Sequence, residues 1–159
     1  SWITLGDIRK HDGKIIYETE ENTNQLGLEN SSARLLPERT VCFARTASVG
    51  FATVIGKKMA TSQDFVNFVC GPDILPEYLL YAFLASRKWL LSIANGSTHK
   101  TIYYPVVKSL FVAIPPLNVQ EIFTHLFNHQ QQSTESMEER SSITDLLKSA
   151  SASRLLTNQ

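Results

Sequence analysis

The 159 residues suit one domain with a helical appendage, and fractions of 43% hydrophobic and 19% charged residues are those of a globular protein that buries a core. No apolar run approaches the ~20 residues of a membrane span, and no charged-then-apolar leader is present, so we expect a cytoplasmic protein. The net charge of zero does not favour a polyanion partner, but the charges are unevenly distributed.

The middle of the chain is the positive part. Residues 1–33 carry three basic and six acidic side chains, residues 34–120 carry nine and four, and residues 121–159 carry three and five. A local positive field on a neutral protein is typical of a surface that binds a polyanion. A solvated surface with scattered lysines is the alternative.

The first two thirds of the sequence read mainly as strands. WITLGDI (residues 2–8) predicts a strand followed by a turn or short helix, and residues 14–32 predict a short strand and a long polar loop. Three runs rich in β-branched and aromatic residues predict further strands, at residues 40–44, 51–55 and 65–70.

A helix and one more strand are expected next. Residues 73–95 have helical spacing, with Pro76 in the first turn and Asn95-Gly96 as a left-handed stop. SLFVAI (residues 109–114) predicts a strand that closes on two prolines. The resulting fold class is α+β, a compact mixed α/β-sheet domain over residues 1–116.

From residue 117 to residue 159 the pattern is that of a long helix. Its apolar stripe is sparse and consists of Phe123, Leu126, Phe127, Met137, Leu147 and Leu155. Such a helix is not self-sufficient, so we expect it to project from the domain and to pair with a partner as a coiled coil. A flexible tail with two helical patches is the alternative.

The two cysteines, Cys42 and Cys70, lie in apolar, strand-like surroundings. We expect both to be buried, reduced thiols. A structural disulfide is not expected in a cytosolic protein, and two cysteines alone do not make a zinc site.

Several catalytic signatures are incomplete. GFATVIGK (residues 50–57) has five residues between its glycines instead of the four of a phosphate loop, and Lys58 replaces the magnesium-binding hydroxyl. STHK (residues 97–100) fits an acyl-transfer nucleophile pattern but lacks its companion motifs. His125 and His129 share a helix face without the central glutamate of a zinc protease. We therefore expect no catalytic activity, metal or cofactor in this chain.

Polar loops between the expected core elements suit DNA instead. Arg and Gln side chains can form bidentate hydrogen bonds with base edges, and Lys, Ser and Thr side chains suit phosphates. Tyrosine can lie against a sugar or a base, although we expect Tyr103 or Tyr104 to pack into the core. The candidate DNA-binding residues are Arg45, Thr46, Ser48, Lys57, Lys58, Gln63, Ser97, Thr98, His99, Lys100 and Tyr103.

The order of these elements resembles a known family. WITLGDI, PERTVCFARTASVGFATVIGKKMATSQDFVNFV, LPEYLLYAFLAS, NGSTHKTIYYPVVKSLFVAIPPLNVQEIF and the helix after them span nearly the whole chain. Together they resemble one target recognition domain of the specificity subunit of type I restriction-modification systems. No single motif is as sharp as a phosphate loop, but the series of elements is specific.

This resemblance implies a function. Specificity subunits carry two such domains, each followed by a long helix, and the two helices pack antiparallel as a spacer. Each domain reads one half of a split double-stranded DNA site. The helices dock modification subunits, which use S-adenosylmethionine to methylate adenine, and a restriction subunit can join.

The chain holds one domain and one helix and begins without a methionine. The resemblance therefore implies a fragment of a specificity subunit, or a half-subunit that dimerises through its helix. The alternative is a regulatory module whose helix recruits a protein partner without DNA.

Overall fold

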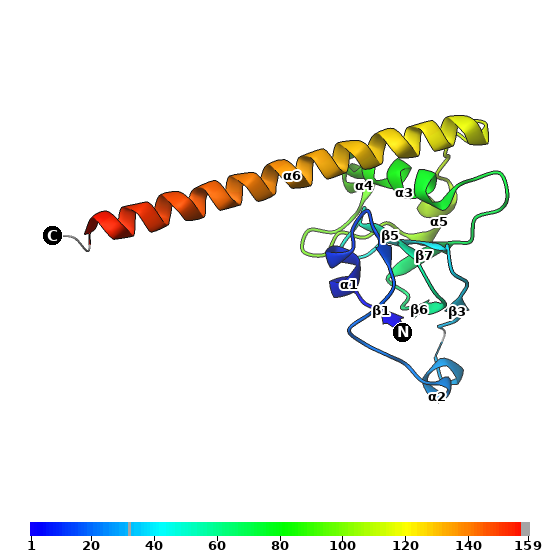
Figure 1. Cartoon of the computed structure of the whole chain (residues 1–159). Coiled ribbons are helices and arrows are strands. Elements are labelled where there is room, and N and C mark those ends of the chain that lie inside the picture. The colour runs from blue at the N-terminus through cyan, green and yellow to red at the C-terminus, as the bar shows by residue number, and fades with distance from the viewer. Residues whose placement is uncertain (32, 157–159) are drawn as a thin grey trace. The chain divides into compact units, whose positions relative to one another are not determined.

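The computed structural model describes residues 1–31 and 33–156, with side chains placed up to residue 145 (Figure 1). The helices are α1 (Leu5–Lys10), α2 (Gln25–Glu29), α3 (Pro76–Ala85), α4 (Arg87–Ile93), α5 (Tyr104–Lys108) and α6 (Leu117–Leu156). The strands are β1 (Trp2–Ile3), β2 (Ile15–Ile16), β3 (Leu35–Leu36), β4 (Val41–Ala44), β5 (Ala52–Ile55), β6 (Met59–Thr61) and β7 (Phe65–Phe68). The chain divides into two units, Ser1–Glu121 and Ile122–Gln159.

Within the described residues of the first unit, the strands form two mixed sheets. The three-stranded sheet has the order β1-β6-β3, with β1 parallel and β3 antiparallel to β6. The four-stranded sheet has the order β2-β5-β4-β7, with β2 parallel to β5 and the other pairs antiparallel. The α+β class expected from the sequence is confirmed.

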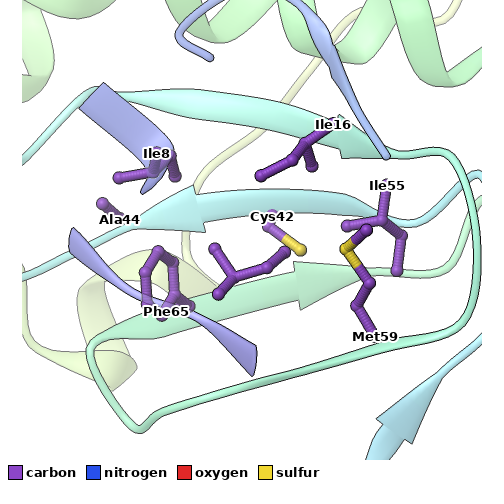
Figure 2. Close-up of a cluster of buried hydrophobic side chains, with 8 residues drawn as sticks. Ile8, Ile16, Cys42, Ala44, Ile55, Met59 and Phe65 are labelled. Carbon is purple, nitrogen blue, oxygen red and sulfur yellow. The ribbon is translucent and has the colours of Figure 1, made fainter. Parts of the chain in front are cut away.

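The main core lies where side chains of α1 and of both sheets meet. Figure 2 shows seven labelled side chains that converge there, Ile8, Ile16, Cys42, Ala44, Ile55, Met59 and Phe65. Strands β4 and β5 are buried at every residue. The side chains of β4 are covered on both faces of the sheet. Cys42 and Ala44 point into this core, whereas Phe43 stacks on Phe83 of α3 with ring centroids 4.7 Å apart.

One buried carboxylate closes the start of α1. Asp7 is 1% exposed and accepts hydrogen bonds from the Thr4 N–H (2.9 Å), the Thr4 hydroxyl (2.7 Å) and the Glu20 N–H (3.1 Å). Burial alone would raise the pKa of Asp7, but these hydrogen bonds hold its pKa below the usual value. The stability that they contribute is present near neutral pH and is lost as the pH falls through that lowered pKa.

The two cysteines differ in burial. Both are free thiols, as expected. Cys42 is fully buried, and burial raises its pKa to about 12, so it stays a neutral thiol. Cys70 is only partly buried because it lies just beyond the end of β7, so the prediction that both are buried is wrong for Cys70.

The structure corrects several expected elements. The helix predicted within residues 73–95 is divided at Ser86 into α3 and α4, and it ends at Ile93, ahead of the expected stop. Residues 109–114 form no strand: they pair with no described strand, and Phe111 is 97% exposed. The short helix α5 occupies the residues just before them, and Pro105 lies in its first turn, where proline is favoured. The short elements α2, β3 and β6 were not predicted at all.

The second unit is helical throughout its described part. Helix α6 has 40 residues, so it is about 60 Å long. This confirms a long C-terminal helix over the alternative of a tail with two helical patches. Leu126 and Met137 are exposed, while the rings of Phe123 and Phe127 lie 6.1 Å apart. The side chains of Leu147 and Leu155 lie outside the described residues.

None of the described helices has the length and apolar character that crossing a membrane would require.

Candidate nucleic-acid interface

The loop over residues 96–100 is closed at its base by the chain itself. Asn95 and Thr101 exchange both backbone hydrogen bonds, at 2.9 and 2.8 Å. Gly96 has φ of +107°, and a Cβ there would lie 2.4 Å from the His99 carbonyl oxygen, so only glycine fits this turn. The fully buried Ile102 follows and anchors the loop to the core.

Three loops that are distant in sequence are joined at the end of β4. The Arg45 N–H donates to the Asp64 carbonyl at 2.9 Å, and the Arg45 carbonyl accepts from the Ile102 N–H at 2.8 Å. The Ala47 N–H donates to the Lys100 carbonyl at 2.9 Å. Loops 45–51, 62–64 and 95–103 therefore form one surface, which we call the recognition edge.

Most of the predicted DNA-binding residues gather on this edge. Those whose side chains are exposed or partly exposed there are Arg45, Thr46, Gln63, Ser97, Thr98, His99, Lys100 and Tyr103. The backbone bonds beneath them fix the loop bases, which lowers the ordering cost of binding. Arg45 is further held by its Nε, which donates to the Gln63 carbonyl at 3.0 Å.

Ser48 does not share this exposure. It is 3% exposed, and its Oγ accepts a hydrogen bond from Arg9 Nε at 2.7 Å. The predicted contact of Ser48 with DNA is therefore not compatible with its position in this structure. Ser48 instead holds the loop against α1.

Lys57 and Lys58 are exposed, but they lie elsewhere. β5 begins beside the recognition edge, where Ala52 pairs with Phe43, and the two lysines follow its other end. A four-residue strand spans about 13 Å. The structure thus separates these lysines from the recognition edge.

The expected packing of a tyrosine is also corrected. Tyr103 is 58% exposed and Tyr104 is 50% exposed, so neither enters the core. Ile102 takes the buried position of this segment instead. Both phenol rings are therefore accessible beside the loops.

A charged clamp holds loop 45–51 from behind. Arg87 donates to both carboxylate oxygens of Asp12, at 2.7 and 2.6 Å, and its Nε donates to the Gly50 carbonyl at 3.1 Å. Its guanidinium carbon lies 4.6 Å from the centroid of the Phe51 ring. Gly50 has φ of +87°, and a Cβ there would lie 2.8 Å from Arg87 Cγ. Sequence reasoning missed this clamp because Arg87 and Asp12 are 75 residues apart and form no motif.

A second missed residue fixes the start of α6 within the first unit. Gln120 is fully buried, and its Oε1 accepts from the Leu75 N–H at 2.8 Å. Its Nε2 donates to the carbonyls of Asp73 and Pro115, both at 2.8 Å. A polar residue three positions after Leu117 on an otherwise polar helix gave no sign of such burial.

Across the described residues, no three His, Cys, Asp or Glu side chains are grouped so as to hold a metal ion. The recognition edge carries hydrogen-bond donors, a guanidinium and an ammonium group, which suit a polyanion with readable base edges. The fold and this surface define a class of protein, a mixed α+β recognition domain with polar loops, followed by a long helix.

The comparisons agree with this class. Residues 3–144 match the family model of the type I restriction modification DNA specificity domain. A solved chain, from work on complex assembly and conformational transition of the type I R-M system, is similar in fold, with a TM-score of 0.59 and 16% identity. The similarity covers 70% of this chain and 27% of that chain, so this protein spans about a quarter of the solved chain. The chain belongs to the family of type I restriction-modification DNA specificity domains.

Proposed function

We propose that this chain reads one half of a bipartite double-stranded DNA site as part of a specificity subunit. The observation that carries the proposal is the recognition edge, where three loops are hydrogen-bonded into one exposed surface. Arg45, Gln63 and His99 have the chemistry to read base edges, whereas Lys100 suits a phosphate because an ammonium acts as a point charge. The family of the chain supports the same role.

The proposal extends to the partners. Modification subunits that bind S-adenosylmethionine and methylate adenine dock on the assembled subunit, and a restriction subunit can join. The cofactor belongs to those subunits, and this chain contributes recognition without catalysis. The complex acts on DNA in the cytoplasm.

Alanine at Thr98 or His99 tests this function directly. Each variant is expected to relax the preference at one base pair, because removing a base contact typically costs ~1–3 kcal/mol at that position. The measurement is a site-selection assay on the assembled methyltransferase. The melting temperature should stay nearly unchanged, since both side chains are exposed and backbone hydrogen bonds close the loop beneath them. Full specificity and full affinity in both variants would contradict the proposal.

The Lys57→Ala, Lys58→Ala double variant tests the predicted phosphate contacts of these two lysines, which lie away from the recognition edge. If these lysines contact phosphates, affinity falls alike for all duplexes, and the salt slope decreases by roughly one unit for each phosphate that is no longer neutralised. Lys100→Ala, which changes a residue of the recognition edge, is expected to decrease the salt slope in the same way. An unchanged slope for the double variant would place the turn after β5 outside the DNA footprint.

We further propose that α6 pairs with the equivalent helix of a second domain, either in a longer subunit or in a homodimer. Apolar side chains on α6 are exposed to solvent, among them Leu126 and Met137. Light scattering at micromolar concentration is expected to give twice the monomer mass, and Leu126→Glu with Met137→Glu to restore the monomer. A monomer at all concentrations, with or without these changes, would rule out the homodimer.

A protein-interaction module without DNA is the second candidate. Exposed apolar side chains on the first unit favour it, namely Val69, Trp89, Phe111 and Ile114. The two candidates differ in one measurement, the affinity for duplex DNA at low salt with methyltransferase subunits present. Absence of any affinity would favour the interaction module.

A further inference from the structure

A groove beside the recognition edge is lined mostly by residues that the function proposed above does not use. It has a volume of about 590 Å³, which is within the range of sites for small ligands. Its lining comes from β1, β6, β7 and the segment before β3. We call it the Trp2 groove, and the lining residues that matter here are Trp2, Arg34, Gln63, Asn67 and Tyr104.

The chemistry of the Trp2 groove is that of a nucleotide site. Trp2 and Tyr104 supply aromatic rings, and the face of such a ring stacks on any base. Arg34 supplies a guanidinium, which suits a phosphate. A second hollow of about 400 Å³ has phenylalanine rings in its lining, including Phe111, but no charged side chain that could bind a phosphate.

Some polar groups of the groove have no hydrogen-bond partner within the described part of the chain. Among the described residues, nothing accepts from the Arg34 guanidinium or bonds to the side-chain amide of Gln63. Asn67 Nδ2 donates to Thr61 Oγ1 at 2.8 Å, but Asn67 Oδ1 is buried with no partner among those residues. A rotation of this amide toward the groove would let Oδ1 accept from the exocyclic amine of adenine or cytosine.

The groove is continuous with the recognition edge. Gln63 belongs to both, and its carbonyl accepts from Arg45 of the edge at 3.0 Å. Tyr104 directly follows Tyr103 at the end of loop 95–103. A nucleotide that leaves the stack of a duplex on the edge would therefore find the groove beside it.

We infer that the Trp2 groove holds one unstacked nucleotide, with its base against Trp2 and Tyr104 and its phosphate at Arg34. In the DNA-bound protein the nucleotide is an everted one, and this part of the inference rests on the proposed function. A free mononucleotide has the same chemistry, so the test separates the two sources. No bond is made or broken in either case.

The DNA source is tested with duplexes selected by the assembled methyltransferase. A single mismatch is placed at each position in turn, because a mismatched base costs less to evert. At one position the mismatch is expected to raise affinity roughly tenfold. Tyr104→Ala and Arg34→Ala should abolish this gain while binding to matched duplex persists. Both side chains are substantially exposed, so these variants keep the fold.

The free source is tested with adenosine and cytidine monophosphates. In a Trp89→Phe protein, Trp2 is the remaining tryptophan, and a base stacked on it quenches its fluorescence. Quenching by the mononucleotides without a mismatch gain would assign the groove to a free nucleotide. Duplex binding with neither effect would overturn the inference and leave the proposed function intact. Absence of duplex binding would overturn the proposed function. The fluorescence measurement with mononucleotides would then show by itself whether the groove binds a nucleotide.

Discussion

Replacing Gln120 with methionine is expected to lower the free energy of unfolding by about 3 kcal/mol, because methionine keeps the length of the side chain but none of its hydrogen bonds. The Leu75 N–H and the carbonyls of Asp73 and Pro115 would each lose a partner at 2.8 Å. Each buried group left without a partner costs about 1–3 kcal/mol, less where water can reach it. Thermal unfolding should show a melting temperature lowered by roughly 10 °C.

The matched control is Gln130→Met, the same change at an exposed position of α6, which should stay within about 0.5 kcal/mol of the unchanged protein. Gln120→Glu adds a pH test. Its carboxylate would face two carbonyl oxygens, which raises its folded-state pKa above the usual ~4.3. Its destabilisation should therefore be largest at pH 7 and shrink as the pH falls through that raised pKa. Equal stability of Gln120→Met and Gln130→Met would contradict the anchoring role of Gln120.

The parts of the fold that the sequence predicts well are those set by local pattern. The runs that became β4 and β5 are apolar at nearly every residue and are buried throughout, and the run that became β7 is apolar at three of its four residues. The 117–156 helix has few strand formers and no proline after its start, so its length was predictable as well. The strand predicted at residues 109–114 is wrong, because an apolar segment forms a strand only where a partner strand can pair with it. The local sequence does not show whether such a partner exists.

The recognition edge was predictable only in part. The polar residues of loop 95–103 stand out because they interrupt apolar elements, and the structure brings them next to Arg45 and Gln63. Lys57 and Lys58 have equally suitable chemistry, but the direction of β5 carries them to the opposite end of the sheet. The burial of Ser48 follows from its bond with Arg9, 39 residues away. Side-chain type indicates what a residue can bind, whereas strand direction decides where it stands.

The clamp behind loop 45–51 is the second place where one substitution should have a large effect. Arg87→Met keeps an unbranched aliphatic stem beside Gly50 and removes the guanidinium, which binds Asp12 and the Gly50 carbonyl and lies over the Phe51 ring. The side chains of Arg87 and Asp12 are 30% and 20% exposed. Breaking a fully buried pair costs about 3–5 kcal/mol and an exposed pair is worth below about 1 kcal/mol, so we expect a loss of about 2 kcal/mol.

A double-mutant cycle with Asp12→Asn isolates the pair, and a coupling energy of about 1–2 kcal/mol is expected in urea unfolding. Arg87→Lys should recover only part of the loss, because a single ammonium cannot reproduce the planar fork that serves Asp12 and Gly50 together. Lys88→Met is the control at an exposed neighbour. A coupling energy near zero would mean that Arg87 acts through packing alone.

The same change should weaken recognition without touching DNA. Loop 45–51 loses its support from α4, so hydrogen exchange at its amides should accelerate while exchange in β4 and β7 stays slow. Binding then has to order the loop again, which lowers affinity for the selected site more than for unrelated duplex, because only the selected site uses Arg45 and Thr46 in a fixed geometry. Equal losses for both duplexes, together with unchanged exchange in the loop, would show that Arg87 does not position the recognition edge.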